Sequence, residues 1–192
     1  MSTALLKPPL KTWTRSEIDA LQEAGILQST RLELIDGELF DKMGQNPPHA
    51  SAVRRLAAAL IAIFGAGRVT VQLPVEPGES DRSRSLPEPD VAVTSETETA
   101  YRTRHPGAAD LLLVAEVADT TYDFDAKRKA KLYARSGFAE YILLDLTEGE
   151  LICMRTPNRG VYTEIHVLRP GDAFHPLAAP DSSLSVADLL AE

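Results

Sequence analysis

The alternation of hydrophobic and polar residues predicts a helix and a hairpin near the start of the chain. Thr14 and Glu17 have the spacing of a capping box, and apolar residues follow at helical intervals until Gly25. In residues 31–40, polar and apolar side chains then alternate around an Asp-Gly pair, which is a strong signal for a two-stranded hairpin. We therefore expect a helix that ends at Gly25, followed by a hairpin.

The next part of the chain predicts a helix and three strands. Residues 49–64 carry apolar side chains at the three- and four-residue spacing of an amphipathic helix. Short apolar runs, typical of strands, follow at residues 69–75, 90–94 and 111–117. The last run begins with five consecutive apolar residues, as expected of a central strand that is buried on both faces. The polar segment 76–89, which contains Arg and Pro, predicts an exposed loop.

The remaining pattern completes an α/β sheet domain. A basic helix over residues 125–136 ends at Gly137, and the apolar run 141–146 predicts another strand. Three smaller elements follow, namely strands at 150–154 and 161–168 and a helix at 185–191. The order helix, three strands, helix, strand (αβββαβ) predicts a central mixed β-sheet flanked by helices, with an N-terminal hairpin and C-terminal strands.

Length and composition predict one globular domain. A chain of 192 residues is long enough for one core, so we expect a single domain over residues 1–192, with 1–12 as a flexible N-terminal segment. No apolar run is long enough to span a membrane, and the N-terminus lacks the apolar region of a signal peptide. The single cysteine, Cys153, excludes an intramolecular disulfide and a Cys-rich zinc site. We therefore expect a cytoplasmic protein.

The formal net charge of −8 argues against a passive nucleic-acid coat, because such proteins need excess Lys and Arg to displace counterions. It does not argue against an enzyme that acts on nucleic acid. Such an enzyme gathers carboxylates around a metal ion and needs only a local basic surface. The distribution of charge is therefore more informative than its sum.

Two acidic residues stand at the ends of predicted strands. Asp90 opens one strand after Pro89, and Glu116 lies near the end of an otherwise apolar one. A buried carboxylate is unfavourable unless a partner compensates its charge, and a divalent cation is a common partner. Either acid alone could simply end a strand at the solvent-exposed edge. The pair predicts a ligand site at the strand ends, where open α/β sheets tend to bind ligands.

Asp125, Lys129 and Tyr133 follow one another at intervals of four residues, so they share one face of the predicted basic helix. Residues 125–135 contain five basic residues and one acid, a net charge of +4 in a chain whose total is −8. On its own this pattern is typical of a solvated helix face with a weak surface pair between Asp125 and Lys129. Beside a carboxylate cluster, the same helix could face a phosphate group.

The ordered set of segments resembles the Uma-type family of restriction-endonuclease-like proteins, within the PD-(D/E)XK nuclease superfamily. Pro89-Asp90 and Glu116 resemble the acid pair of that superfamily, and the resemblance extends from about Trp13 to the C-terminus. The matching stretches are residues 31–39, His49, residues 89–93, Glu116-Val117, Asp125 with Lys129 and Tyr133, and residues 137–145. The resemblance implies a restriction-endonuclease-like fold and an endonuclease that hydrolyses DNA.

The resemblance also implies a metal site formed by Glu33, Asp90 and Glu116, with Mg²⁺ or Mn²⁺ as cofactor. Carboxylate oxygens are suitable ligands for either ion, and the bound metal would activate a water molecule. Glu33 could instead pair with a basic neighbour. Ala118 departs from the superfamily pattern, because it occupies the position of the lysine in E-X-K. The resemblance implies that Lys129 replaces that lysine, so that Asp90, Glu116 and Lys129 would be the catalytic residues.

His49, Lys127, Lys131 and Tyr133 are candidates for binding DNA. His49 starts a predicted helix, where its ring could reach the scissile phosphate or simply fill an N-terminal turn. Lys127 and Lys131 lie on other parts of the basic helix than Lys129, where they could contact the DNA backbone. Since nucleases that cut both strands commonly dimerise, we also expect a homodimer.

Other functions remain open or are disfavoured at this point. A non-catalytic nucleic-acid-binding or regulatory module that retains the nuclease fold would agree with Ala118 and with the acidic composition. A metal phosphoesterase acting on a small molecule would need a closed pocket rather than an open basic groove. The other histidines lack the spacing of a zinc site, and the chain has neither a glycine-rich phosphate loop nor a G-x-S-x-G motif.

Overall fold

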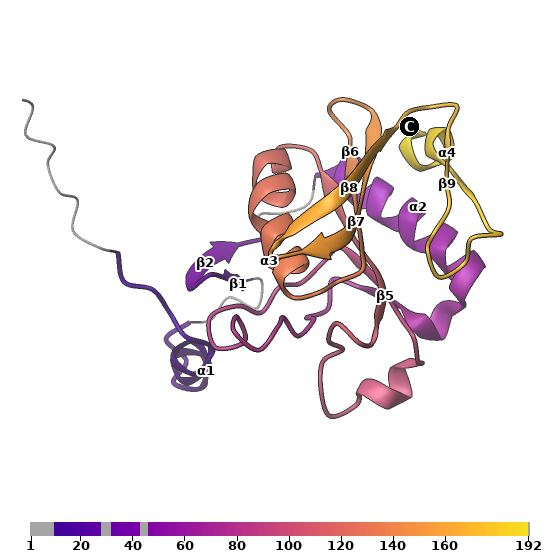
Figure 1. The fold of residues 1–192 in the computed structure, drawn as a ribbon. Coiled ribbons are helices and arrows are strands. Elements are labelled where there is room, and N and C mark those ends of the chain that lie inside the picture. Colours follow the sequence, from indigo (N-terminus) through magenta and orange to yellow (C-terminus); the bar gives the residue numbers. More distant parts are fainter. Residues whose placement is uncertain (1–9, 28–31, 43–45, 192) are drawn as a thin grey trace, which may run out of the picture.

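Six strands form one mixed sheet at the centre of the computed structural model, which describes residues 10–27, 32–42 and 46–191 (Figure 1). β5 and β6 are parallel, and the other neighbouring pairs are antiparallel. The strands lie in the order β3 (Val69–Val71), β4 (Val91–Thr94), β5 (Leu111–Ala118), β6 (Glu140–Asp145), β7 (Glu150–Asn158) and β8 (Val161–Leu168). The predicted mixed sheet is confirmed, although β3 is shorter and β7 longer than expected.

Helices cover both faces of this sheet. α2 (Pro47–Phe64) packs on one face together with the short α4 (Val186–Leu190), and α3 (Ala130–Arg135) packs on the other. A separate hydrophobic core lies under each helix layer. The predicted αβββαβ order is therefore confirmed.

The central strand β5 contributes to both cores. Leu113 and Ala115 belong to the core under α2, whereas Val114 and Ala118 belong to the core under α3. This alternation confirms the predicted burial of β5 on both faces. It also places Glu116, which lies two residues from both Val114 and Ala118, on the α3 side.

The N-terminal helix and hairpin form as predicted. α1 (Arg15–Glu23) begins with a complete capping box between Thr14 and Glu17. β1 (Leu32–Ile35) and β2 (Glu38–Asp41) form the hairpin around the Asp-Gly turn. The φ angle of Gly37 is +79°, and a Cβ at this position would lie 2.9 Å from Thr12. Only glycine therefore fits where the hairpin turn meets the segment before α1.

The predicted flexible segment 1–12 falls mostly outside the described residues, and so does Arg31, the first residue of the predicted hairpin. Within the described part, Leu10 is 85% exposed, whereas Lys11 pairs with Glu17 at 2.7 Å. Flexibility of this segment and the single-domain boundary 1–192 remain predictions.

The segment 76–89 is not the exposed loop that its composition predicts. Its second half lies along the hairpin, where the Leu86 N–H donates to the Leu34 carbonyl at 2.8 Å and the Gly37 N–H donates to the Arg84 carbonyl at 2.7 Å. Ser85 is buried and accepts a hydrogen bond from the Asp36 N–H at 3.0 Å. Because the hairpin satisfies these polar groups, the segment can be partly buried.

α2 begins two residues earlier than predicted, at Pro47. The side chain of Asn46 caps the helix by accepting a hydrogen bond from the His49 N–H at 2.9 Å. Proline is suited to the first turn of a helix, because its missing N–H would have no partner there.

Within the described ranges, no helix combines the length and the apolar character needed to cross a membrane.

The predicted basic α-helix begins with wider turns. Residues Phe124–Lys129 are π-helical, and regular α-helix starts only at Ala130. Asp125, Lys129 and Tyr133 are nevertheless all buried. The interpretation of these three residues as part of a solvated face is therefore wrong. Short π-helical turns occur frequently at functional sites.

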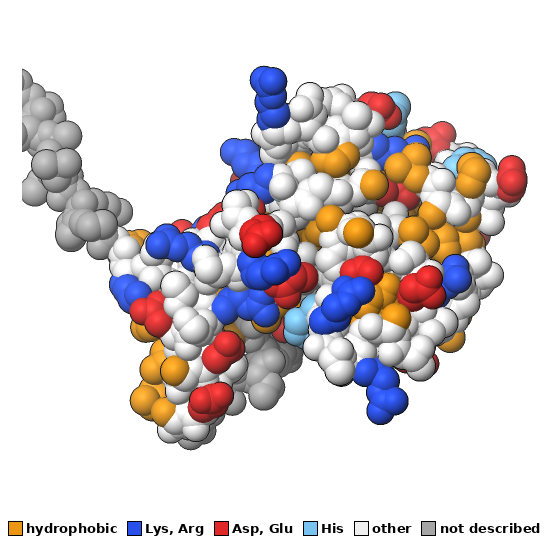
Figure 2. Space-filling view, turned by 60° about the horizontal axis from the view of Figure 1, so that its bottom comes forward, with side chains coloured by type: hydrophobic (Ala, Val, Ile, Leu, Met, Phe, Trp, Pro, Cys, Tyr) orange, Lys and Arg blue, Asp and Glu red, His pale blue; other side chains and the backbone are white. Residues whose placement is uncertain are grey.

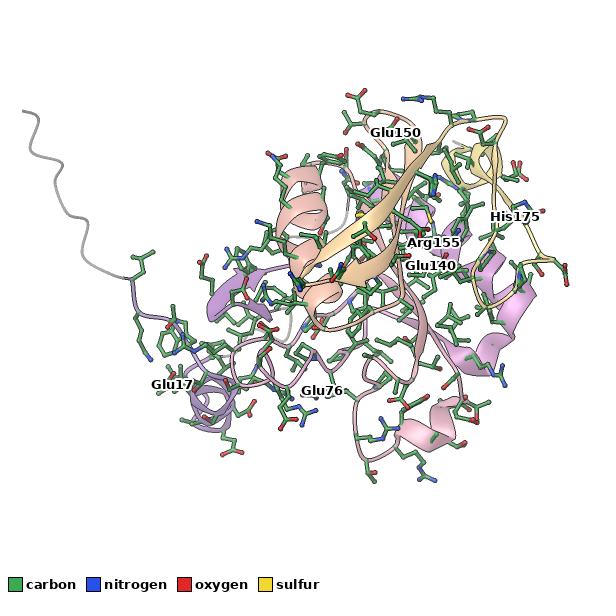
Figure 3. The ribbon with its side chains drawn as sticks, viewed as in Figure 1. Glu17, Glu76, Glu140, Glu150, Arg155 and His175 are labelled. Atoms are coloured by element: carbon green, nitrogen blue, oxygen red, sulfur yellow. The ribbon has the colours of Figure 1, made fainter. Side chains whose placement is uncertain are left out.

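The chain after β8 folds back against the sheet through two short strands that the sequence did not predict, β9 (Ala173–Phe174) and β10 (Leu184–Ser185). The buried carboxylate of Glu140 on β6 helps to hold this segment, because it accepts a hydrogen bond from the Leu177 N–H at 3.0 Å. The Arg155 guanidinium on β7 pairs with the same carboxylate and donates to the His175 carbonyl (Figure 3).

Candidate active site

The start of β4 and the end of β5 meet because these strands are antiparallel neighbours, with Val91 opposite Ala115. Asp90 directly precedes β4, and its N–H donates to Glu116 Oε2 at 3.3 Å. Asp90 and Glu116 are 7% and 3% exposed. The structure therefore brings the two acids together, and both are buried rather than solvent-exposed strand ends; their convergence on one metal ion stays a prediction.

Asp90 accepts hydrogen bonds from several directions. Its Oδ2 accepts from the Val117 N–H at 2.9 Å, and its Oδ1 accepts from Gln72 Nε2 at 3.1 Å. His49 Nε2, from the first turn of α2, lies 3.2 Å from Asp90 Oδ2. Burial alone would raise the pKa of Asp90, but the hydrogen bond and charge of His49 lower it below the ordinary value. Asp90 is therefore held as a carboxylate.

His49 forms an ion pair with Asp90 when its ring is protonated. The hydrogen bond to Asp90 raises the pKa of His49 despite its partial burial. The other ring nitrogen, Nδ1, is buried and has no hydrogen-bond partner among the described residues. The ring therefore presents an unused polar atom beside the two acids.

Lys129 lies at the centre of the acidic cluster. Its Nζ is 2.9 Å from Glu116 Oε1, 3.0 Å from Glu33 Oε2 and 3.8 Å from Asp125 Oδ1. Burial would lower the pKa of Lys129, but the surrounding carboxylates raise it well above its ordinary value. The amine is therefore charged. The structure thus places Lys129 against Glu116, and Glu33 pairs with a basic neighbour.

Glu116 is fixed by a second donor from α3. The Tyr133 hydroxyl donates to Glu116 Oε1 at 2.6 Å, and the tyrosine side chain is fully buried. Burial raises the pKa of Glu116 to about 8, and the nearby carboxylate of Asp90 adds to this shift while Lys129 opposes it. Burial and the neighbouring carboxylates therefore both disfavour a negative charge on Glu116. Tyr133 lies behind the carboxylate and positions it.

Glu33 and Asp125 complete the cluster, and each has its own hydrogen-bond donor. Glu33 Oε1 accepts from the Glu88 N–H at 2.9 Å, so the segment before β4 orients the hairpin carboxylate. Asp125 Oδ2 accepts from Thr121 Oγ1 at 2.6 Å. Burial raises the pKa of Asp125 to about 6. Sequence reasoning placed Asp125 on the correct helix face but did not identify it as part of the site.

Lys127 and Lys131 lie outside the cluster. Both are exposed, and Lys127 pairs with Asp123 at 2.7 Å. A solvated helix face therefore describes these two lysines correctly. Figure 2 shows Lys and Arg side chains interspersed with Asp and Glu on one face of the molecule, rather than a continuous basic surface.

The cluster opens into a cleft of about 660 Å³. Its walls come from the hairpin, the start of α2, the strand ends and the π-helical stretch, and its rim carries further acids such as Asp41 and Asp119. A larger hollow, of about 880 Å³, lies beside α1. The arginines there are already paired, Arg15 with Glu76 and Arg104 with Asp110. The smaller cleft is therefore the stronger candidate for chemistry.

The donor chemistry of this cleft fits Mg²⁺ or Mn²⁺. Its carboxylates outnumber its cations, and carboxylate oxygens are the ligands that these ions prefer. Within the described ranges, no three acidic, His or Cys side chains already surround one point as metal ligands. The Lys129 ammonium instead lies between Glu33 and Glu116. Side chains of the cluster would therefore rearrange around a bound ion.

Both the sequence and the fold are similar to those of nuclease-like proteins. The sequence matches the model of the Uma2 family, described as "Putative restriction endonuclease", over residues 16–187. The fold is similar to a crystal structure from Anabaena variabilis, described as "a putative nuclease belonging to DUF820", with a TM-score of 0.69 and 18% sequence identity. That match covers 88% of this chain and 96% of the other. No protein with curated annotation matches the sequence.

Proposed function

Because this chain belongs to the Uma2 family, described as "Putative restriction endonuclease", we propose that it is a metal-dependent endonuclease that hydrolyses DNA phosphodiester bonds. One observation carries the proposal: Glu33, Asp90, Glu116 and Lys129 come from separate parts of the chain and meet in one cleft. Such a cluster of buried acids is unfavourable for folding. Its presence therefore supports a functional site rather than a structural one.

Glu33, Asp90 and Glu116 would hold Mg²⁺ or Mn²⁺. When bound, the ion supplies a Lewis acid that lowers the pKa of water and offsets charge on the phosphate. Asp90 is prepared for this role because it is already ionised. Glu116 would lose its proton when the ion binds, since burial raises its pKa to about 8.

Lys129 would act on the attacking water or on the charge that develops at the phosphate. Its ammonium lies beside Glu116, and the residue already lines the cleft. Tyr133 would keep the Glu116 carboxylate in place through its hydroxyl. His49 would act from the other side of the cleft, where Asp90 holds its ring through Nε2.

Lys127 and Lys131 would contact the DNA backbone rather than the reacting phosphate. Both are exposed on the helix that lines the cleft. Their contribution would be electrostatic and would therefore decrease with salt concentration. Because the cleft itself is acidic, we expect divalent ions to assist DNA binding as well as catalysis.

The main argument for a non-catalytic module is Ala118, which stands where the superfamily has a lysine. The side chain of Lys129 supports the catalytic proposal instead, because its Nζ lies 2.9 Å from Glu116 Oε1. The amine of Lys129, from the π-helical stretch before α3, could serve as well as an amine from β5. The two functions therefore differ in whether the protein cleaves DNA, which can be measured directly.

The test is a cleavage assay on supercoiled and linear DNA with Mg²⁺, with Mn²⁺ and with EDTA, combined with metal titration by calorimetry. The Asp90→Asn variant is the matched control, because it removes one ligand and leaves the size of the side chain unchanged. We expect cleavage that requires metal and is lost in Asp90→Asn. Metal and DNA binding without any cleavage would favour the non-catalytic module, and absence of metal binding would overturn the proposal.

A further inference from the structure

β8 forms one edge of the central sheet and has an unpaired outer side. β7 pairs with its inner side, and no described residue pairs with its outer side (Figure 1). The strand is eight residues long and contains neither lysine nor proline, which natural edge strands often use to prevent pairing. The opposite edge, β3, has only three residues. β8 is therefore a strand that remains free to pair.

The side chains on β8 are unusually apolar for an exposed strand. Val161, Ile165 and Val167 are 52%, 58% and 42% exposed. Ile165 and Val167 lie opposite Met154 and Ile152 of β7, which belong to the core under α3. This core thus continues to the edge of the sheet, where the side chains of Ile165 and Val167 are exposed. β-branched side chains of this kind pack well against a neighbouring strand.

We propose that β8 pairs with β8 of a second copy of this chain, antiparallel and centred on Ile165. The two six-stranded sheets would then continue across a twofold axis as one sheet. Ile165 would pack against its own copy at the axis, and Val167 would pack against Thr163 of the other copy. The exposed ends of the two α3-side cores would cover each other.

The symmetry of an antiparallel pair restricts the possible registers. Residues that lie directly opposite each other have side chains on the same face and direct their backbone groups in the same way. Neighbouring residues in a strand alternate in both respects. A strand that pairs with its own copy must therefore have the twofold axis at a residue and not between two residues. For β8, the two registers with the greatest overlap are centred on Glu164 and on Ile165.

Charge distinguishes these two registers. An axis at Glu164 would place that carboxylate directly opposite its own copy, which is destabilising. An axis at Ile165 places Glu164 opposite His166 of the other copy, and by symmetry this contact occurs twice. A histidine can donate a hydrogen bond to a carboxylate. Glu164, Ile165 and His166 are all exposed in the single chain. The register centred on Ile165 is therefore favoured.

This interface would leave the cleft open. β6 and β7 separate β8 from β5, which carries Glu116. The two clefts of the dimer would lie toward the outer ends of the joined sheet. The proposal therefore does not depend on nuclease activity, and its test needs no substrate.

Disulfide formation tests the register directly. Residues opposite each other in an antiparallel pair have Cα atoms about 4.5–5.5 Å apart, which is within the range of a disulfide. We expect Ile165→Cys to form a covalent dimer under mild oxidation and Glu164→Cys to remain largely monomeric on a denaturing gel. Wild type is the control, since its only cysteine, Cys153, is buried. Crosslinking of Glu164→Cys but not of Ile165→Cys would overturn the proposed register.

The oligomeric state tests the interface itself. Light scattering should give twice the chain mass of 20.9 kDa for wild type. Ile165→Lys and Glu164→Lys should shift the protein to monomer at the same concentration, while Glu164→Lys combined with His166→Glu should restore the dimer. Circular dichroism would verify folding, which these exposed positions should not affect. A wild-type monomer at about 100 μM, or a dimer that survives Ile165→Lys, would overturn the proposal.

Discussion

The amine of Lys129 lies 2.9 Å from Glu116 Oε1, although the two residues are 13 positions apart in the sequence. β5 ends shortly after Glu116, and the chain then turns into the π-helical stretch that contains Lys129. The superfamily pattern supplies its lysine from the same strand as the acid, two residues further on. Here position 118 is alanine, and its side chain contributes to the core under α3. The helix above that core supplies the amine.

Lys129→Ala should abolish most DNA cleavage. A positioned proton-transfer or charge-stabilising group typically contributes about 10²–10⁴-fold to a rate, and we expect a loss in that range. Lys127→Ala is the matched control on the same helix, because Lys127 is exposed and forms its ion pair with Asp123 rather than with the acidic cluster. It should weaken DNA binding in a salt-dependent way while cleavage at saturating DNA is retained. Equal effects of the two substitutions would contradict the role of Lys129.

Glu33→Gln should weaken Mg²⁺ or Mn²⁺ binding by about tenfold or more, because the amide cannot replace a charged ligand. The exposed acid Glu38, on the second strand of the same hairpin, is the control. It pairs with Arg128 on the protein surface, so Glu38→Gln should leave metal affinity unchanged. Calorimetric titration of both variants and wild type would measure the difference. If Glu33→Gln binds metal as wild type does, Glu33 serves only as a partner of Lys129.

The stability of the metal-free protein should fall as pH rises from about 4.5 to about 8. Burial raises the pKa of Glu116 from 4.5 to about 8 in the folded state. Within this window the unfolded chain releases a proton that the folded chain retains, so increasing pH favours unfolding. Glu116→Gln should remove much of this dependence and raise the melting temperature at pH 8. Saturating Mg²⁺ should stabilise wild type at pH 8 more than the variant.

Thermal unfolding at several pH values checks this expectation. A change of 1 kcal/mol shifts the melting temperature by about 2–4 °C in a chain of this size, which is readily measured. Asp125 contributes in the same direction, because burial raises its pKa to about 6. The Asp125→Asn variant should therefore flatten the lower part of the same window. A melting temperature that is independent of pH in wild type would show that Glu116 ionises normally.

The sequence predicted the fold well because hydrophobic periodicity determines the main elements. The capping box at Thr14 and the apolar run of β5 are local patterns, and both formed as expected. The sequence also paired Asp90 with Glu116, because acids within or beside apolar strands need a partner, whereas Lys129 was assigned to the site only through the resemblance to the nuclease family. These predictions depended on short segments whose burial follows from their own residues.

Other features could not be predicted because they depend on contacts between distant segments. Gln72 reaches Asp90 only because β3 ends beside β4, and Glu33 is oriented by the Glu88 N–H across 55 positions. The burial of Ser85 likewise depends on the position of the hairpin. The π-helical turn has no simple local signature. Each of these features forms only when the sheet has packed, because the contacts that stabilise it come from distant segments.

A final prediction concerns the ion pair between Glu140 and Arg155, which joins β6 to β7 (Figure 3). Glu140 is only 1% exposed, and burial raises its pKa above the ordinary value. Arg155→Ala would leave this carboxyl group without its cation. Loss of one partner of a buried pair typically destabilises by about 3–5 kcal/mol. Since Arg155 is partly exposed, we expect about 3 kcal/mol, or a decrease of about 6–12 °C in melting temperature.

Arg169→Ala is the matched control for this substitution. Arg169 pairs with Glu150 at 3.1 Å, but its side chain is 69% exposed. Exposed pairs contribute about 0–1 kcal/mol, so this variant should unfold nearly as wild type does. The loss of melting temperature caused by Arg155→Ala should also shrink as pH falls, because the unpaired Glu140 then becomes protonated and no longer carries a buried charge. Equal melting temperatures for the two variants would mean that solvent reaches Glu140, and that the Leu177 N–H alone is enough to hold the C-terminal segment.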